Sequence, residues 1–408
     1  MNILLINHYA GSAKHGMEYR PYYLAKEWVS KGHTVTIIAS SFSHLRSTQP
    51  VIKKNIEEDN IDGIQYIWIR TNKYSGNSIF RIINMLSFTL KGIFYNRKIK
   101  KKYDKVIFTY PFEVFFANLL AKRNKAEFIF EIHDLWPLSF IELGGMSKYN
   151  PFVFLMQLCE NFAYKKADKI STVLPNIREH VLSHGYSKLK KIYYIPNGIN
   201  IKEWHKKVPI VSNDIQIKID QLKKEKYKII LYAGTHGNAN SLNTFIESAS
   251  MMKNEKIFFL LIGSGPQKQK LMKEASNKNI KNIVFFNSIP KESLIPVLKQ
   301  SDILYIGFKN ISLYKHGIAA NKIFDYMMAE KPIICAVNSS NDIISVAKSG
   351  LTIEPENAKI LKDAIRKLIN KKSDERKKIG LNGKKFVRKN HDYKILAQIY
   401  IKALYEVI

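Results

Sequence analysis

Six short apolar runs alternate with helical patterns in the second half of the chain, and this alternation constrains the fold more than any other feature of the sequence. The runs are rich in Ile, Leu, Val, Phe and Tyr, and the segments between most of them place apolar residues at helical spacing. Strands that alternate with helices form a parallel sheet covered on both faces, so the pattern predicts a doubly wound α/β unit. The predicted strands are KIILYAG (228–234), IFFLLIG (257–263), NIVFFNS (282–288), DILYIGF (302–308), PIICAV (332–337) and LTIE (351–354).

The first half of the chain contains the same alternation. NILLIN and HTVTIIAS are typical of strands, and the helical pattern between them has Pro21 in its first turn and Gly32 at its end. KVIFTY (105–110) and EFIFEI (127–132) predict two more buried parallel strands. We interpret the polar, lysine-rich stretch 199–227 as the linker between two α/β domains.

The length of 408 residues supports two domains, because a single hydrophobic core rarely grows beyond about 300 residues. Two such domains predict a cleft, and ligands of these folds bind at the carboxyl ends of strands. Cys159 and Cys335 lie far apart, so we expect neither a disulfide framework nor a metal cluster, and a reducing cytoplasm fits best. The first apolar run is too short for a signal peptide, and no run reaches the roughly 18 residues of a membrane span.

The charge balance is extreme, with 65 basic and 34 acidic residues and a net charge of +31. An excess of this size indicates an anionic partner, and nucleic acid, an anionic membrane and a phosphorylated substrate are the candidates. General solubility is the alternative explanation. We find neither a basic stripe with stacking aromatic residues nor a known nucleic-acid module, and therefore expect no nucleic-acid partner.

The first candidate loop is HYAGSAKHGMEYR (8–20), which follows the first predicted strand. Gly11 and Gly16 have the spacing of a phosphate loop, but Met17 and Glu18 replace the lysine and hydroxyl residue of a Walker motif. Small residues before a helix still let backbone amides approach an anion or a sugar. An ordinary flexible loop is the alternative.

Two more candidate loops follow predicted strands. His133 and Asp134 emerge together at the end of EFIFEI, although a lone histidine is more often structural than catalytic. In YAGTHGNANSLNTF (232–245), the amides from Gly234 to Asn238 could hold a phosphate, or the loop could be a plain turn.

The fourth candidate is KHGIAANKIFDYMMAEKPII (315–334), in which a helix is predicted to start near Ala320. Lys322 falls in the first helical turn, where a cation costs roughly 0.3 to 1 kcal/mol unless an anion lies between it and the amides. Asp325 lies one turn further along the same face. We therefore predict that this segment binds a diphosphate and that Asp325 accepts hydrogen bonds from ribose hydroxyls. A solvated surface lysine is the alternative.

At these loops the chain resembles glycosyltransferase family 4, whose members are retaining enzymes of the GT-B fold. Within the family it is most similar to the WbuB-like, N-acetylfucosamine transferase-like subgroup of bacterial surface polysaccharide synthesis. The ordered segments that carry the resemblance are NHYAGSAKHGMEYRPYYLAKEWVSKGHTVTIIASSFSHLR (7–46), EIHDLWP, IPNGI, YAGTHGNANSL, IGSGP and NKIFDYMMAEKPII.

The resemblance implies two Rossmann-like domains that face each other across a cleft. Residues 1–198 would bind the acceptor, residues 199–390 would bind a sugar nucleotide, and the C-terminal helix 391–408 would pack back on the first domain. The loop 286–290 would lie against the base, and His133 beside the donor sugar. The reaction would be a front-face displacement that needs no general base, metal or cofactor, so catalysis would depend on stabilising the leaving diphosphate.

The sequence departs from the family pattern at two places. The family carries two glutamates with seven residues between them, but here Asp325 holds the second position and Gly317 the first. The usual arginine and lysine of the second domain are also missing, and His236 and Asn238 stand in that loop. Lys322 is therefore expected to be the main cation on the diphosphate.

Together these readings predict a transferase that moves an N-acetylated deoxyhexose or hexose to a polyprenyl-diphosphate-linked saccharide in capsule or O-antigen synthesis. The resemblance favours UDP over GDP as the nucleotide. A GT-B sugar-nucleotide epimerase and a basic nucleic-acid-binding protein are the alternatives. The predicted catalytic residues are His133, Asp134 and Lys322, and the predicted donor-binding residues are Gly11, Gly16, Thr235, His236, Asn238, Gly263, Ser288, Ile289, Gly317, Ile318, Ala319, Asn321, Lys322 and Asp325.

A membrane partner is suggested by the stretch 79–105, where an apolar, aromatic segment precedes a run of basic residues. Each basic group near an anionic leaflet is worth about 1 kcal/mol, so we predict a cytoplasmic protein that is peripheral on the inner face of the membrane. A core helix followed by a solvated turn is the alternative. The basic residues are Arg97, Lys98, Lys100, Lys101 and Lys102.

Overall fold

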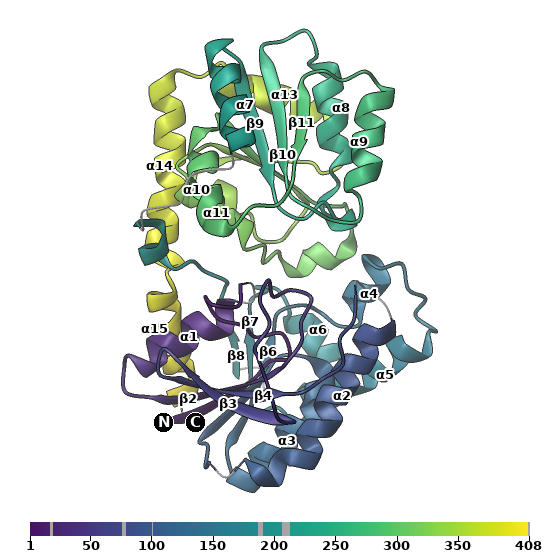
Figure 1. Ribbon diagram of the computed structural model, residues 1–408, viewed down its shortest axis with the longest axis vertical. Coiled ribbons are helices and arrows are strands. Elements are labelled where there is room, and N and C mark those ends of the chain that lie inside the picture. The colour runs from purple at the N-terminus through teal and green to yellow at the C-terminus, as the bar shows by residue number, and fades with distance from the viewer. Residues whose placement is uncertain (17–18, 76–78, 100, 187–190, 206–212, 407–408) are drawn as a thin grey trace. The chain divides into compact units, whose positions relative to one another are not determined.

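The computed structural model describes residues 1–16, 19–75, 79–99, 101–186, 191–205 and 213–406. The chain divides into two compact units (Figure 1). Unit 1 contains Met1–Asn197 and Tyr393–Ile408, and unit 2 contains Gly198–Asp392. Met17, Glu18 and Lys100, which the sequence analysis singled out, lie outside the described residues.

Unit 1 is built on an eight-stranded sheet with the order β3-β4-β2-β1-β5-β6-β7-β8. All neighbouring strands are parallel except the β3–β4 pair, which is antiparallel. The strands are β1 (Asn2–Ile6), β2 (Thr34–Ser40), β3 (Ile56–Ile61), β4 (Ile64–Ile69), β5 (Lys105–Phe108), β6 (Glu127–Ile132), β7 (Lys169–Thr172) and β8 (Ile192–Tyr194). The four strands predicted in the first half are therefore confirmed, and the β3–β4 hairpin, β7 and β8 are additions.

Helices cover both faces of the unit 1 sheet (Figure 1). On one face, α1 and α15 pack together, and the indole nitrogen of Trp28 donates a hydrogen bond of 3.1 Å to the carbonyl oxygen of Ala397. On the other face, α3 packs on β5 and β6 and lies between α2 and α5. The helices are α1 (Tyr19–Val29), α2 (Ile79–Tyr95), α3 (Val114–Asn124), α4 (Leu138–Glu142), α5 (Pro151–Lys166), α6 (Arg178–Ser183) and α15 (Tyr393–Tyr405).

Unit 2 is a parallel six-stranded sheet with the order β11-β10-β9-β12-β13-β14. Its strands are β9 (Lys228–Ala233), β10 (Ile257–Ile262), β11 (Ile283–Phe286), β12 (Ile303–Gly307), β13 (Ile333–Ala336) and β14 (Gly350–Ile353). All six apolar runs that were predicted as strands in the second half of the chain are thus strands. Both halves of the chain have the doubly wound form that was predicted.

The helices of unit 2 also lie on both faces of its sheet. Residues of α8, α9 and α13 share one buried cluster with the sheet, and residues of α7, α10, α11 and α14 share the other. The helices are α7 (Asn213–Lys224), α8 (Asn243–Met251), α9 (Lys268–Asn277), α10 (Lys291–Gln300), α11 (Lys322–Met328), α12 (Ile343–Val346), α13 (Ala358–Ile369) and α14 (Ser373–Asn390).

The prediction of a linker over 199–227 is wrong for its second half. Helix α7 occupies Asn213–Lys224, and Ile215, Ile219 and Leu222 are buried in the core of unit 2. These three residues have the spacing of one helical face, and the surrounding lysines obscured it. Among the described residues, no helix combines the length and the hydropathy that crossing a bilayer would require.

Candidate functional site

The candidate donor site of unit 2 begins where β9 and β10 end in glycine loops. Gly234 and Gly263 have φ angles of +149° and +154°, and a Cβ atom at Gly263 would overlap the carbonyl oxygen of Gly234. Only glycine allows the two loops to approach this closely. The close approach brings the ends of neighbouring strands to one edge of the sheet, where ligands bind in folds of this type.

A pocket of about 310 Å³ opens beside these loops. Four predicted donor-binding residues line it, namely Thr235, Gly263, Ser288 and Ile289, and the structure therefore brings them together. Ile262 and Leu294 add apolar walls, and the hydroxyl groups of Ser264 and Ser288 lie 3.2 Å apart. An apolar cavity with a few polar groups can accept an aromatic base.

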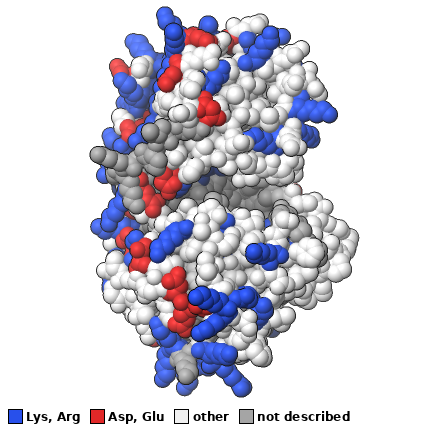
Figure 2. All heavy atoms as spheres, in the orientation of Figure 1, with Lys and Arg blue, Asp and Glu red and all other residues white. Residues whose placement is uncertain are grey.

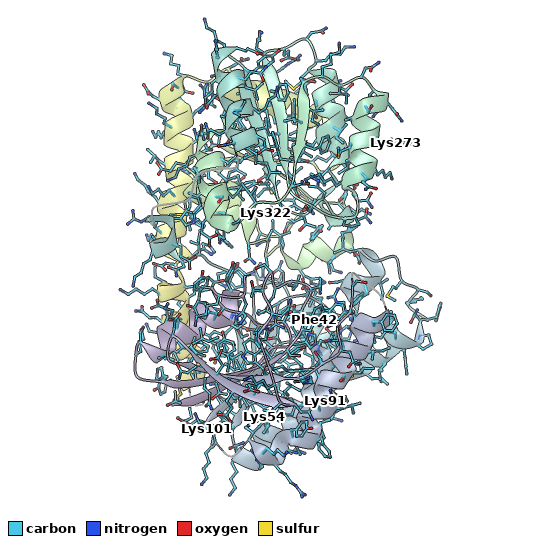
Figure 3. All side chains as sticks on the ribbon, in the orientation of Figure 1. Phe42, Lys54, Lys91, Lys101, Lys273 and Lys322 are labelled. Carbon is cyan, nitrogen blue, oxygen red and sulfur yellow. The ribbon has the colours of Figure 1, made fainter. Side chains whose placement is uncertain are left out.

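Lys322 is the first residue of α11, and its side chain turns inward toward the end of β9 (Figure 3). Its ammonium nitrogen donates hydrogen bonds of 3.0 Å to the Tyr232 hydroxyl and to the Asn240 side-chain oxygen. The nitrogen lies 4.6 Å from the centre of the Tyr232 ring and 2.9 Å from where a Cβ atom of Gly234 would be. The alternative of a solvated surface lysine is therefore wrong.

The charge of Lys322 is poorly compensated. Burial lowers the pKa of its ammonium group to about 8, and no carboxylate among the described residues forms an ion pair with it. A buried cation that has only neutral hydrogen-bond acceptors is stabilised when an anion arrives. The site can therefore receive a negatively charged group beside Gly234.

Asp325 lies one turn after Lys322 but contacts a different element. Its carboxylate forms an ion pair of 3.1 Å with Lys291, at the start of α10. Phe324, Met327 and Met328 are buried and fix the helix to the core. Asn321 precedes the helix at an exposed position and makes no side-chain capping hydrogen bond. The helix starts two residues later than predicted and holds seven residues.

In the loop before α11, two of the predicted donor-binding residues have amides that are hydrogen-bonded within the protein. Gly317 has a φ of +111°, and its amide donates to the carbonyl oxygen of Tyr314 at 3.0 Å. The amide of Ile318 donates to the Asn341 side-chain oxygen at 2.8 Å, and the Asn341 amide group donates back to Ile318 at 3.0 Å. Both amides are thus used inside the protein. Ala319, the third predicted residue of this loop, is half-buried.

His236 and Asn238 occupy different places although they share one loop. His236 is fully buried and neither ring nitrogen has a hydrogen-bond partner among the described residues. Burial, with the nearby charges of Lys268 and Lys322, lowers the pKa of His236 to about 4, so the ring is neutral. Asn238 lines a separate pocket of about 440 Å³ with Gly237 and Lys309.

In unit 1, His133 and Asp134 follow β6 as predicted, and Asp134 is exposed. The Nε2 atom of His133 lies 3.1 Å from the Glu131 carboxylate, which also pairs with Arg20 at 3.0 Å. Burial opposes ionisation of Glu131, but the charges of Arg20 and His133 outweigh it and lower its pKa to about 2. Arg20 also donates to the carbonyl oxygens of Ile195 and Pro196, so the cluster connects β6 to the segment after β8.

The glycines of the first candidate loop have structural contacts. The carbonyl oxygen of Gly11 accepts a hydrogen bond of 2.8 Å from the Tyr66 hydroxyl. Gly16 has a φ of +67°, its amide donates to Ser12 at 3.1 Å, and a Cβ atom there would overlap the Ser47 side chain. These contacts favour the alternative of an ordinary turn for Gly16.

One group of possible metal ligands exists among the described residues, and it contains none of the predicted site residues. The ligand atoms of Glu160, His180 and His184 are within 4.8 Å of one another. Glu160 already accepts hydrogen bonds of 2.9 Å from Tyr164 and Gln157. Metal independence of the reaction stays a prediction.

Sequence reasoning missed four side chains that the structure adds to the site. Tyr232 and Asn240 hold Lys322, Lys291 pairs with Asp325, and Glu131 holds His133. The glycine-rich sequence after β9 indicated the correct loop, but it did not indicate that Asn240 is the residue of this loop that bonds Lys322. The sequence does not distinguish Glu131 from the other residues of its strand, because its partner Arg20 is distant in sequence.

Family models match nearly all of the described chain. Residues 15–203 match the model described as Glycosyltransferase Family 4, and residues 213–386 match the model described as Glycosyl transferases group 1. The chain is built of two glycosyltransferase domains. The first match ends at residue 203, shortly after unit 2 begins at Gly198.

Relatives of these glycosyltransferase domains are distant. The putative colanic acid biosynthesis glycosyl transferase WcaI of Escherichia coli is 25% identical over 233 residues, which cover 55% of this chain and 56% of that protein. Sucrose-phosphate synthase from Thermosynechococcus elongatus has a TM-score of 0.72 at 15% identity, with 99% and 98% of the two chains covered. Anabaena HepE in complex with UDP and glucose has a TM-score of 0.67 at 13% identity, with 99% of both chains covered. The fold is therefore GT-B, and the finer subgroup is not decided by these similarities.

Proposed function

We propose that the protein is a retaining glycosyltransferase that binds a UDP-sugar in unit 2. The observation that carries the proposal is the uncompensated ammonium group of Lys322 beside Gly234, a residue that lines the same pocket as Thr235 and Ile289. A nucleoside diphosphate matches this arrangement, since its base fits an apolar cavity and its phosphates need a cation. The solved structure of HepE, of the same fold, contains UDP and glucose.

Lys322 supports the chemical step by stabilising the leaving diphosphate. Charge on the leaving oxygen grows as the bond to the sugar breaks, and an ammonium group fixed by two hydrogen bonds needs no reorganisation at that moment. His236 is neutral and adds no charge to the phosphates. The acceptor hydroxyl transfers its proton to the departing phosphate oxygen, so no separate general base is required.

Two other groups complete the proposed machinery. Asp325 accepts hydrogen bonds from the ribose hydroxyls, and its ion pair with Lys291 holds the carboxylate in place. His133 contacts the donor sugar, as in the family that the chain resembles, and Glu131 fixes its ring. Asp134 is the neighbouring polar group and is exposed for a substrate contact.

We further propose that the acceptor is a polyprenyl-diphosphate-linked saccharide of capsule or O-antigen synthesis, and that the donor carries an N-acetylated deoxyhexose or hexose. WcaI, which is described by its role in colanic acid biosynthesis, supports a polysaccharide product. The protein would then work on the inner face of the cytoplasmic membrane. The basic residues Arg97 and Lys98 follow α2 directly, whereas the side chain of Lys101 turns to Gln65 on β4.

The proposal is tested with a panel of nucleotides and sugar nucleotides in a thermal unfolding assay, followed by a turnover assay. UDP and one UDP-sugar should raise the melting temperature, because a ligand that binds only the native state stabilises it. UDP should then be released only when a lipid-linked acceptor is added. Release of UDP without acceptor, together with a changed sugar configuration, would favour the epimerase alternative instead.

A further inference from the structure

Helix α2 of unit 1 exposes an apolar stripe. Phe80, Ile83, Leu90 and Phe94 are 60%, 42%, 65% and 77% exposed, and their spacing places them on one face of the helix. The opposite face is already buried, with Phe88 at 0%. The core therefore uses only half of the apolar surface of α2, and the stripe must be covered by something else.

Helices α3 and α5 extend this stripe. Phe115 and Leu119 of α3 are exposed one turn apart, and Phe154, Leu155 and Leu158 of α5 are 63%, 42% and 49% exposed. The ring of Phe115 lies 5.4 Å from the ring of Phe162, which joins the two helices at the surface. Since α3 packs against both α2 and α5, these exposed side chains lie on three neighbouring helices, whose exposed apolar surface we call the three-helix face.

The apolar exposure is concentrated on this face. Nine of the twenty large hydrophobic residues that are exposed in the described part of the chain belong to α2, α3 and α5, which have 17, 11 and 16 residues. Contiguous apolar surface of this kind marks an interaction site in a water-soluble domain, whereas single exposed apolar residues are ordinary. The concentration thus indicates a partner rather than chance exposure.

The charges on the same helices identify the partner. The three helices contain one acidic residue, Glu160, which is 1% exposed. In Figure 2 the surface over α5 is largely white, and the red spheres of unit 1 lie away from it. A face with exposed aromatic and aliphatic side chains and only positive charges complements an anionic lipid surface. The six basic residues of the three helices are Arg81, Lys91, Lys122, Arg123, Lys165 and Lys166.

We propose that unit 1 docks on an anionic lipid bilayer through the three-helix face, with the α2 stripe entering the interface and the basic residues contacting headgroups. A second copy of this chain would fit less well, because both copies would bring positive charge to the contact and the chain as a whole carries +31. This proposal rests on the proposed function in one respect: docking would bring unit 1 to the lipid-linked acceptor.

The test is vesicle sedimentation at low salt with the full chain. Wild type should bind vesicles that contain about one third phosphatidylglycerol at least tenfold more tightly than pure phosphatidylcholine vesicles, and high salt should remove the difference. Two double variants probe the two components of the face: Leu90→Gln/Phe94→Gln removes apolar surface, and Lys165→Glu/Lys166→Glu reverses charge. Each should weaken binding by about tenfold or more.

Matched controls change equally exposed residues of unit 2. Ile217 and Met251 are 67% and 52% exposed, so Ile217→Gln/Met251→Gln controls for lost apolar surface. Lys385→Glu/Lys389→Glu, on exposed positions of α14, controls for charge reversal. Both controls should bind vesicles like wild type. Circular dichroism and the melting temperature confirm that each variant is folded.

Three results would overturn the proposal: equal binding to neutral and anionic vesicles, equal losses in the unit 2 controls, or self-association in solution that Leu90→Gln/Phe94→Gln abolishes. The last result would assign the face to a second copy. UDP-induced stabilisation is measured on the same samples. If the wild type is stabilised by UDP but does not bind anionic vesicles, the docking face alone is refuted. If the wild type binds anionic vesicles but is not stabilised by UDP, the proposed function alone is refuted.

Discussion

The pH dependence of UDP binding should report directly on Lys322. Burial lowers the pKa of its ammonium group from 10.5 to about 8 in the free protein. A diphosphate beside the nitrogen would favour the charged form and return the pKa toward its ordinary value. In the complex, Lys322 would then keep a proton that it loses above about pH 8 in the free protein. The affinity for UDP should therefore be highest well below pH 8 and fall as the pH rises through 8.

The size of the effect follows from the shift. A pKa of about 8 in the free protein and about 10.5 in the complex predicts a roughly 30-fold loss of UDP affinity between pH 7 and pH 9.5, or about 2 kcal/mol. Isothermal titration calorimetry at several pH values measures it. Lys322→Met should bind UDP weakly at pH 7 and show no such slope, and Lys322→Ala should lower kcat strongly because the leaving diphosphate loses its cation.

Two results would refute this role of Lys322. If the wild-type affinity is unchanged between pH 7 and pH 9.5, the ammonium group does not contact the phosphates. If Lys322→Met has the same slope as wild type, another titrating group is responsible.

Three further predictions concern other parts of the site. Asp325→Ala should raise the donor KM about tenfold with a smaller change in kcat, because it removes contacts to the ribose and not to the reacting bond; an equal fall in kcat would contradict that assignment. Glu131→Gln should lower the free energy of unfolding in urea by about 3 kcal/mol, since it breaks a pair in which Arg20 and Glu131 are 4% and 2% exposed. The matched change Glu255→Gln, in a pair with Arg366 at 29% and 47% exposure, should lower the free energy of unfolding far less, and equal costs would argue against a buried pair. Turnover should be unaffected by EDTA, and a loss that Mg²⁺ or Mn²⁺ restores would refute metal independence.

The sheet of unit 2 was predictable because its strands are buried on both faces and so appear as continuous apolar runs. The antiparallel hairpin of unit 1 was not, since β3 is the polar segment IEEDNI at the edge of the sheet. A signal was present in Asp62–Gly63, whose φ angles of +52° and +80° suit a tight hairpin turn. Helix α7 was missed because its three core residues are separated by lysines and other polar residues.

The sequence predicted which loops carry the candidate site, but it did not predict which side chains pair within it. The cost of a lysine in the first turn of a helix pointed to Lys322, and the structure shows that its nitrogen turns into the protein. Its partners Tyr232 and Asn240 come from another strand and loop, so only the folded chain reveals them. Gly317 and Ile318 were predicted to bind the donor, but the amide of Gly317 donates to Tyr314 in a local turn and the amide of Ile318 donates to the distant side chain of Asn341.

The most direct test of the central claim is a crystal structure of the protein with UDP. The account predicts the phosphates within hydrogen-bond distance of the Lys322 nitrogen and the base in the pocket lined by Gly263 and Ile289. Phosphates bound at any other place, with the Lys322 nitrogen still held by Tyr232 and Asn240 alone, would contradict it.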